Sequence, residues 1–278
     1  MKRFAALMLL ILAACLPASE PSKQTLPYRF YMPIAKIPAP RKGMGLSYGV
    51  CSDAIAMGTR WQYGWTARPT ACNYTEDVPM IWGYSQMGAT VTGDSPYLMG
   101  FNEPDRPGQA NLTPGEAAEL WHMLEAEHPD RLLVSPAPSH LHPEWLALFR
   151  GAYIGRYGTP PRLDALAIHC YGTLAGCRPV IQQVINYAEA WNIAGGVWVT
   201  EFAVLPCWYS DPADAVAEEQ RLIEWMESQA SITRYAHFTS RIRGDEWWGP
   251  VPECNTALFD WGTYTPTIYG EMYREMGP

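Results

Sequence analysis

The sequence has little positive charge. Its 278 residues include 20 Lys and Arg against 28 Asp and Glu, which gives a formal net charge of −8. A protein that binds nucleic acid through phosphates needs clustered basic residues, so this balance disfavours a nucleic-acid partner. Charged residues make up only 17% and apolar residues 48%, which is typical of a compact globular protein and not of a disordered one.

The CxxC spacing of structural zinc sites is also missing, so we expect no metal. Cys15 closes the leader described below, and six other cysteines remain. An even number of cysteines in an exported chain indicates disulfides, although six of them allow many pairings. We predict the pairs Cys51–Cys72, Cys170–Cys177 and Cys207–Cys254.

The apolar run at residues 4–14 is too short to cross a bilayer as a mature helix. Two basic residues precede it, and it ends in Leu-Ala-Ala-Cys, which resembles the lipobox of bacterial lipoproteins. We therefore predict a signal peptide over 1–14 and a lipid anchor at Cys15, with the outer membrane favoured because Leu16 replaces an aspartate there. The Pro-rich residues 15–43 are expected to form an extended tether, with an arm packed on the domain as the alternative.

Short apolar runs alternate with amphipathic ones from residue 44 onward, which is typical of βα units. Eight strands are predicted at 46–50, 60–65, 78–82, 97–101, 132–135, 165–169, 197–201 and 235–239. Helices are predicted at 117–127, 143–153, 179–191 and 215–229, of which the first follows a Thr113 cap with Glu116 in the first turn. The pattern over residues 44–278 predicts an α/β fold with a single (β/α)₈ barrel of the TIM type, with shortened or irregular early helices.

Two glutamates follow predicted strands at the edge where a barrel places its active site. Glu103 ends the fourth strand within Asn-Glu-Pro, and Glu201 ends the seventh within Thr-Glu-Phe. Strands three apart bring these side chains face to face across the mouth. Retaining glycosidases use two such carboxylates, one to protonate the leaving oxygen and one to attack the anomeric carbon. The pair predicts glycoside hydrolysis, a chemistry that needs no cofactor, whereas a lone strand-end glutamate is more often a solvated one.

Aromatic residues favour Trp and Tyr, with 12 and 16 against only 7 Phe. Such rings bury area and still donate a hydrogen bond, so a Trp-rich core competes with a sugar-stacking surface as the explanation. Residues with alternating or loop positions are our candidates for sugar contact: Trp61, Tyr63, Trp65, Trp82, Trp208, Trp247, Trp248 and Trp261. Trp198 has the opposite parity to Glu201 and is expected to face the helices.

The order and spacing of these stretches resemble glycoside hydrolase family 128, the β-1,3-glucanases of clan A. The matching stretches are 61–65, 78–83, 100–105, 168–171 and 198–202. The resemblance implies a retaining endo-β-1,3-glucanase in which Glu103 is the general acid/base and Glu201 the nucleophile. The acid should hold its proton near neutral pH while the nucleophile stays ionised.

Further site residues follow from the same resemblance and from strand parity. Asn102 is expected to hydrogen-bond the sugar 2-hydroxyl. His169 and Tyr171 share one face of the sixth strand, so we expect Tyr171 to approach Glu201 and His169 to contact a sugar hydroxyl or a carboxylate. A satisfied core histidine is the alternative for His169.

Two positions depart from the family pattern. Gly64 stands where the family has Asn, and His237 stands where it tends to carry Trp, which would remove a stacking ring. Three other functions remain open: a surface lipoprotein that binds β-glucan without turnover, a hydrolase of another β-linked glycan, and a scaffold with structural aromatics. The expected partners are β-1,3-glucan and, through the lipid anchor at Cys15, a membrane, with the chain itself a monomer.

Overall fold

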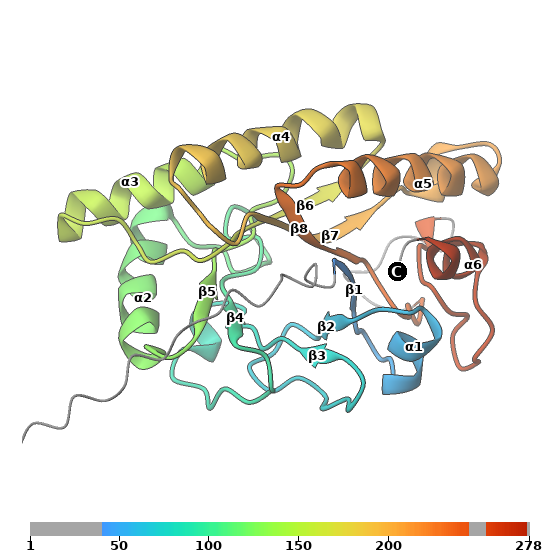
Figure 1. The fold of residues 1–278 in the computed structure, drawn as a ribbon, viewed down its shortest axis with the longest axis horizontal. Helices are drawn as coiled ribbons and strands as arrows, with labels where there is room; N and C mark the ends of the chain where they lie inside the picture. The colour runs from blue at the N-terminus through green and yellow to red at the C-terminus, as the bar shows by residue number, and fades with distance from the viewer. Residues whose placement is uncertain (1–40, 245–253, 277–278) are drawn as a thin grey trace, which may run out of the picture. The chain divides into compact units, whose positions relative to one another are not determined.

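The computed structural model describes residues 41–244 and 254–276 of the chain (Figure 1). The predicted signal peptide, Cys15, Trp247 and Trp248 lie outside these residues. The described part holds eight strands: β1 (Lys42–Gly45), β2 (Trp61–Tyr63), β3 (Glu76–Asp77), β4 (Tyr97–Met99), β5 (Leu132–Val134), β6 (Leu166–Tyr171), β7 (Val197–Ala203) and β8 (Ile232–His237).

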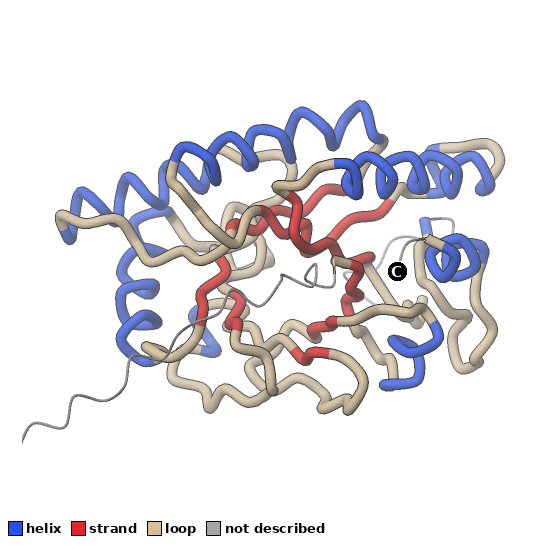
Figure 2. The backbone as a smooth tube through the Cα atoms, in the orientation of Figure 1, coloured by secondary structure: helices blue, strands red, loops and turns tan. Residues whose placement is uncertain are grey.

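Helices connect most of these strands, and the early connections are the short ones. The helices are α1 (Cys51–Ala56), α2 (Pro114–Glu127), α3 (Trp145–Tyr157), α4 (Leu174–Ala190), α5 (Pro212–Ser228) and α6 (Ile268–Glu275), with 3₁₀ turns η1 (Tyr84–Gln86) and η2 (Pro206–Trp208). Figure 2 shows loops along the edge that carries β2 and β3, whereas long helices cover the later strands. No helix in the described ranges has the length and apolar character needed to span a bilayer.

All pairs among these eight strands are parallel. Six strands pair in the order β3-β2-β1-β8-β7-β6, and β4 pairs with β5. Single bridges from Met80 to Met99 and from Val134 to Ala165 join the two sheets. The predicted (β/α)₈ barrel is therefore confirmed. Its first five strands are shorter than the predicted ranges, and its last three are longer.

Large aromatic rings fill the barrel interior. Trp61 and Trp198 are fully buried there with their ring centroids 5.3 Å apart. A Cβ at Gly43 would lie 2.2 Å from Trp61 Cε2, so only glycine fits opposite this ring. This packing explains why the first strand is glycine-rich and lacks the apolar signal of a strand.

The prediction for the first strand was therefore wrong. Residues 46–50 form a loop, and β1 begins at Lys42, two residues before the expected domain boundary at 44. The prediction for the third strand was also wrong, because β3 is Glu76–Asp77 and the predicted range 78–82 contributes only the Met80 bridge. Helix α4 begins at Leu174 after a Thr173 cap, not at Pro179, which lies inside the helix.

Two of the predicted helices begin at capping residues, three residues ahead of the predicted ranges: α2 after Thr113 and α5 after Asp211. The Thr113 side chain accepts from the Glu116 N–H, and the Glu116 carboxylate accepts from the Thr113 N–H, which closes a capping box at α2. The Asp211 side chain caps α5 in the same position by accepting from the Ala213 N–H at 2.9 Å.

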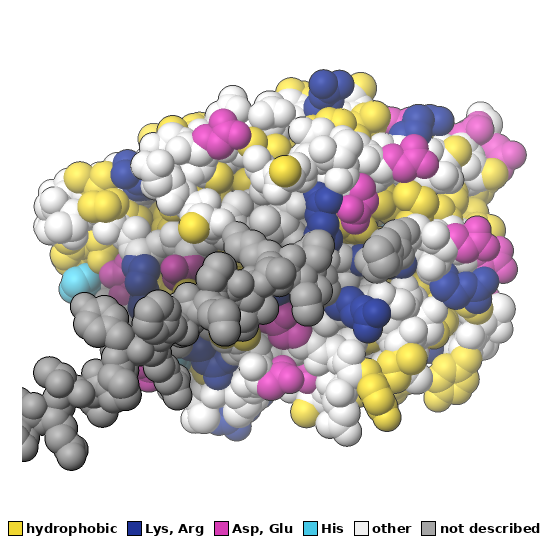
Figure 3. Space-filling model, in the orientation of Figure 1, with side chains coloured by type: hydrophobic (Ala, Val, Ile, Leu, Met, Phe, Trp, Pro, Cys, Tyr) yellow, Lys and Arg dark blue, Asp and Glu magenta, His cyan; other side chains and the backbone are white. Residues whose placement is uncertain are grey.

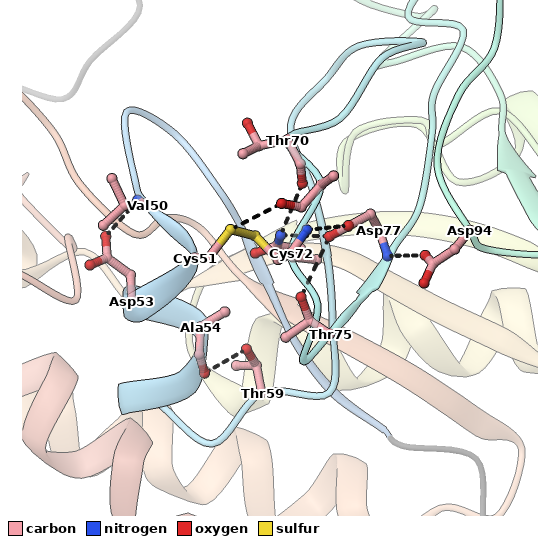
Figure 4. The surroundings of a disulfide bond; sticks show 12 residues. Val50, Cys51, Asp53, Ala54, Thr59, Thr70, Cys72, Thr75, Asp77 and Asp94 are labelled. Carbon is pink, nitrogen blue, oxygen red and sulfur yellow. Dashed lines mark hydrogen bonds between the residues drawn. A yellow bond between two sulfur atoms is a disulfide. The ribbon is translucent and has the colours of Figure 1, made fainter.

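All three predicted disulfides are present: Cys51–Cys72, Cys170–Cys177 and Cys207–Cys254. The first ties the start of α1 to the loop ahead of β3, where Asp77 accepts hydrogen bonds from the Cys72 N–H and from Gln62 (Figure 4). The other two flank the carboxyl ends of β6 and β7, so they brace loops at the mouth of the barrel.

Candidate active site

A bulge in β7 brings the second glutamate into the barrel mouth. Val199 pairs with Ile168 and Glu201 pairs with His169, so β7 carries one more residue than β6 at this point. The extra residue places Trp198 and Glu201 on the same inner side. The prediction that Trp198 faces the helices was wrong for this reason, because strict alternation ignores a bulge.

Glu103 and Glu201 converge at the mouth. One carboxylate oxygen of each, together with a nitrogen of His169, lies within 4.8 Å of the other two. The Glu103 side chain is 14% exposed and that of Glu201 only 6%, so both are shielded but open to the same space. Glu103 has a left-handed backbone φ of 37°, which turns its side chain at the end of β4.

Three aromatic donors surround the Glu201 carboxylate. Trp65 Nε1 donates to Oε1 at 2.7 Å, and the Tyr171 hydroxyl donates to Oε2, as strand parity predicts. The Tyr63 hydroxyl lies 3.4 Å from Oε1 and donates at 2.8 Å to the Thr200 carbonyl. Hydrogen bonds to a carboxylate favour its ionised form and fix its orientation.

His169 links the two glutamates. Its Nδ1 lies 3.1 Å from Glu103 Oε1 and 3.4 Å from Glu201 Oε2, and the ring is fully buried. Of the two expected contacts, the structure shows the one to a carboxylate, and a sugar contact stays a prediction because the ring is not among the cleft-lining residues. An N–H on Nδ1 can be shared between both carboxylates.

The pKa shifts of the two glutamates run opposite to the expectation of a protonated Glu103 and an ionised Glu201. Burial raises the pKa of Glu201, aided by the Glu103 charge and opposed by His169 and the aromatic donors. At Glu103, burial acts upward, but the hydrogen bond and charge of His169 outweigh it and the pKa is lowered. Burial lowers the pKa of His169, yet both glutamates together raise it above its usual value. In the free site, protonation therefore favours Glu201 and His169 over Glu103.

A cleft of about 640 Å³ opens above the carboxylates. Its walls come from loops after several strands: Ser47, Trp65, Trp82, Asn102, Glu103, Arg106, Gly108, Gln109, Ser139, His140, Tyr171, Glu201, Leu205, Phe238 and Thr256. Sequence reasoning missed Arg106, Gln109 and His140, because loop residues after β4 and β5 carry no periodic pattern.

Asn102 is held by one of these missed residues. Its Nδ2 donates to Gln109 Oε1 at 3.1 Å, while its buried Oδ1 has no hydrogen-bond partner among the residues that the structure describes. Asn102 is 4% exposed and lines the cleft beside Glu103. A buried acceptor without a partner leaves room for a hydroxyl donor from a bound sugar.

The aromatic residues divide into two groups. Trp65 and Trp82 line the cleft, whereas Trp61 and Tyr63 are 0% and 1% exposed in the barrel interior. The prediction of a sugar-stacking wall was thus wrong for Trp61 and Tyr63, because the lower residues of a barrel strand point into the packed core. Trp208 is exposed on η2 but does not line the cleft.

The expected loss of a ring at strand eight was also wrong. His237 faces the helix side of the barrel, where Nε2 lies 3.0 Å from the Thr256 carbonyl oxygen. The next residue, Phe238, lines the cleft and packs edge-on against Trp65 and Tyr171. Strand β8 alternates regularly, with Arg234 and Ala236 on the inner side and His237 on the outer side, so parity places Phe238 at the cleft. At Gly64, an added Cβ would meet nothing closer than 3.6 Å.

The cluster of Glu103, His169 and Glu201 also offers three ligand atoms for a metal. Its single histidine nitrogen already lies within hydrogen-bonding distance of both carboxylates. These groups directly support the chemistry of two carboxyl groups that act on one sugar bond, in which one transfers a proton and the other attacks as a nucleophile.

The model of the family described as glycosyl hydrolase catalytic core matches residues 46–273 of the chain. Comparison with curated protein sequences gives no match. The matched range contains every cleft-lining residue named above.

Several solved structures are similar over most of the chain. A family 128 (subgroup I) endo-β-1,3-glucanase from Amycolatopsis mediterranei, in complex with laminaritriose, is 27% identical over 86% of this chain and 100% of its own, with a TM-score of 0.67. A subgroup III curdlan-specific exo-β-1,3-glucanase from Blastomyces gilchristii is 25% identical over the same shares, with a TM-score of 0.67. A subgroup II endo-β-1,3-glucanase from Sorangium cellulosum, at 24% identity over 84% of this chain and 98% of its own, shares the fold with a TM-score of 0.68.

Proposed function

The chain belongs to the glycosyl hydrolase catalytic core family, and from that premise we propose that it is a retaining glycoside hydrolase that cleaves β-1,3-glucan. The observation that carries the proposal is the approach of Glu103 and Glu201 to within 4.8 Å at the floor of one cleft. Retaining enzymes hold their carboxyl groups about 5 Å apart, whereas inverting enzymes separate them by about 6.5 Å or more to admit a water.

Glu201 is the proposed nucleophile and Glu103 the proposed acid/base. Trp65 and Tyr171 hold the Glu201 carboxylate by donating to different oxygens, which orients it and stabilises its charge. Glu103 is the more exposed of the two carboxyl groups and stands nearer to loop residues of the cleft, where a leaving group departs.

Substrate binding must reorder the protons for this reaction. Glu103 has the lowered pKa in the free site and Glu201 the raised one. A sugar that covers Glu103 removes its remaining contact with water and favours its protonated form. His169, within 3.4 Å of both carboxylates through Nδ1, provides the short path by which a proton can pass from one to the other.

The substrate class rests on similarity. Two of the similar structures at 25% identity or more, the two named above, are described as β-1,3-glucanases, one endo and one exo. Trp65, Trp82 and Phe238 give this chain apolar faces on which a sugar ring can lie, and Asn102 Oδ1 offers an acceptor to a hydroxyl. Endo cleavage is the proposed mode.

Product analysis on laminarin tests the activity. The wild type should release reducing ends as a ladder of oligosaccharides, with the newly formed end retaining the β configuration in the first NMR spectra. Release of glucose alone would replace endo by exo action. Absence of turnover on laminarin with turnover on a β-1,4- or β-1,6-glucan would refute the substrate but keep the enzyme class.

Two substitutions test the roles of the glutamates. Glu201→Ala should lose turnover, and azide should partly restore it by attacking the anomeric carbon in place of Glu201 as the bond to the leaving group breaks, which gives an α-glycosyl azide. Glu103→Gln should retain a fast first step only on aryl glycosides with good leaving groups, because these need no acid. Full activity of both variants on laminarin would end the assignment.

Location outside the cytoplasm on a lipid anchor remains our proposal for the amino-terminal residues. It is supported by the basic and apolar residues before Cys15. Labelling of cells with palmitate should mark the wild type, and Cys15→Ser should remove the label. A labelled Cys15→Ser variant would refute the anchor site.

A further inference from the structure

We propose that Tyr48, Trp261 and Tyr264 form a second carbohydrate-binding site, here called the rim platform, which holds a β-glucan chain where it leaves the cleft. The proposal rests on the proposed function, because the ligand is the same polymer. The platform is separate from the cleft lining, which includes none of these three residues.

The three rings are unusually exposed for their size. Tyr48 is 51% exposed, Trp261 45% and Tyr264 75%. Tyr48 and Trp261 meet at a centroid distance of 5.5 Å with an interplanar angle of 88°, so their faces form a corner. Figure 3 shows hydrophobic side chains at the surface near α1 and the loop that leads into α6. Exposed apolar groups that gather on one surface indicate a binding site.

A buried ion pair fixes the loop that carries two of the rings. Arg241 forms two hydrogen bonds with the Asp53 carboxylate, at 2.7 Å and 2.8 Å. The same guanidinium donates to the carbonyls of Asp260 and Thr263, on either side of Trp261. A Phe259–Pro266 bridge closes the base of this hairpin. The rings are therefore presented by a rigid support, which lowers the entropy lost on binding.

Tyr48 connects the platform with the cleft. It follows Ser47, which lines the cleft, and the Ser47 carbonyl accepts from Ser240 Oγ at 2.7 Å. The Tyr48 backbone has a φ of 50°, a left-handed conformation that a bulky residue rarely adopts. Such a conformation persists only where the surroundings hold it, and it is common at ligand-binding positions.

A glycan chain is the occupant that these observations favour. Trp and Tyr offer an apolar face with a polar edge, which matches a sugar ring with its C–H faces and hydroxyl rim. Continuity through Ser47 and Tyr48 places the platform beside the wall that Trp65 and Phe238 build inside the cleft. A polymer that fills the cleft extends beyond it, whereas a short oligosaccharide does not reach the rim.

The decisive experiment compares polymer with oligosaccharide in Trp261→Ala and Tyr264→Ala. Each substitution should raise KM for laminarin about tenfold, since a lost aromatic contact of this kind corresponds to about one decade in affinity. Cleavage of a laminari-oligosaccharide that fits the cleft should stay within twofold of wild type. Trp261→Phe should restore most of the polymer KM.

Tyr74→Ala is the matched control for Tyr264→Ala. Tyr74 is 73% exposed, and it belongs neither to the cleft lining nor to the rim platform. Removal of the Tyr74 ring should leave KM for laminarin unchanged. An equal effect of Tyr74→Ala and Tyr264→Ala, or no effect of Trp261→Ala, would overturn the platform while leaving the proposed function intact.

Gel retention in laminarin separates the platform from catalysis. The wild type should be slowed in a laminarin gel, and Trp261→Ala should be slowed less, whether or not the polymer is cleaved. No retention of the wild type would overturn the platform. The remaining alternative is that the rings form a contact between two copies of the chain, which sedimentation tests by measuring the oligomeric state. A wild-type dimer that Trp261→Ala dissociates would refute the platform.

Discussion

Two buried pairs of glutamate and histidine stand on opposite sides of the wall that β7 and β8 form. Glu201 and His169 lie on the inner side, at the mouth of the barrel. Glu219 of α5 and His237 of β8 lie on the helix side, with Glu219 Oε1 at 3.6 Å from His237 Nε2. The residue types match, yet the two pairs carry opposite charge states.

The sealed pair is neutral. Burial raises the pKa of Glu219 to about 8, although a hydrogen bond from the Val204 N–H opposes it. Burial lowers the pKa of His237 to about 3, and the charge of Lys42 adds to this. Neither group is ionised near neutral pH, so no charge is buried and the pair is structural.

The pair at the mouth is charged because a second carboxylate is present. The charge of Glu201 acts together with the hydrogen bond and charge of Glu103, and they raise the pKa of His169 although burial lowers it. The comparison teaches that a buried Glu–His contact has no chemistry of its own. Two features decide whether the protons can take part in catalysis: how many carboxylates surround the histidine, and whether one of them is open to the cleft.

The largest contrast is expected from the same substitution at the two glutamates. Glu201→Gln should reduce kcat on laminarin by at least about a thousandfold, because the amide cannot attack the anomeric carbon. Glu219→Gln should keep kcat within about twofold, since a protonated carboxyl and an amide are nearly isosteric. Initial rates of reducing-end release measure both. A comparable loss in the two variants would erase the distinction between the sites.

A smaller contrast is expected at His169. His169→Ala removes the N–H and the positive charge that lower the pKa of both Glu103 and Glu201. The acid-side inflection of kcat/KM, which reports ionisation of the nucleophile, should move to higher pH, with a loss of about ten- to hundredfold at neutral pH. His169→Gln keeps a donor without the charge and should shift the profile less. A purely structural histidine predicts lower stability with an unmoved profile.

Much of the active site could be predicted from strand-end residues. Glu103, Glu201 and Tyr171 lie at the ends of barrel strands, and a barrel directs those positions to one mouth. The position of Trp198 could not be predicted, because the β7 bulge that turns it inward leaves no mark in the sequence.

The depth of a side chain along its strand was the other feature that could not be predicted from the sequence. Trp61, Tyr63 and Trp65 alternate alike, but only Trp65 reaches the cleft. Alternation indicates which face a side chain is on and not how deep it lies along the barrel axis. The loop residues Gln109 and His140 reach the site through turns whose course depends on tertiary contacts, so their part could be found only in the structure.

The weakest and most specific contrast concerns stability and not turnover. The pKa of Glu219 is about 8 when folded and near 4.5 in an unfolded chain, so the folded protein binds the extra proton between these values. The stability from this group is present below about pH 4.5 and is lost as pH rises towards 8, at up to about 1.4 kcal/mol per pH unit. Glu219→Gln cannot ionise, so its free energy of unfolding should exceed that of the wild type by a margin that grows from pH 5 to pH 8. Urea unfolding at a series of pH values measures this difference, in which the other titrating groups cancel. A constant difference between the two proteins would mean that Glu219 is already ionised in its sealed pocket, and the proposed neutrality of that pair would be wrong.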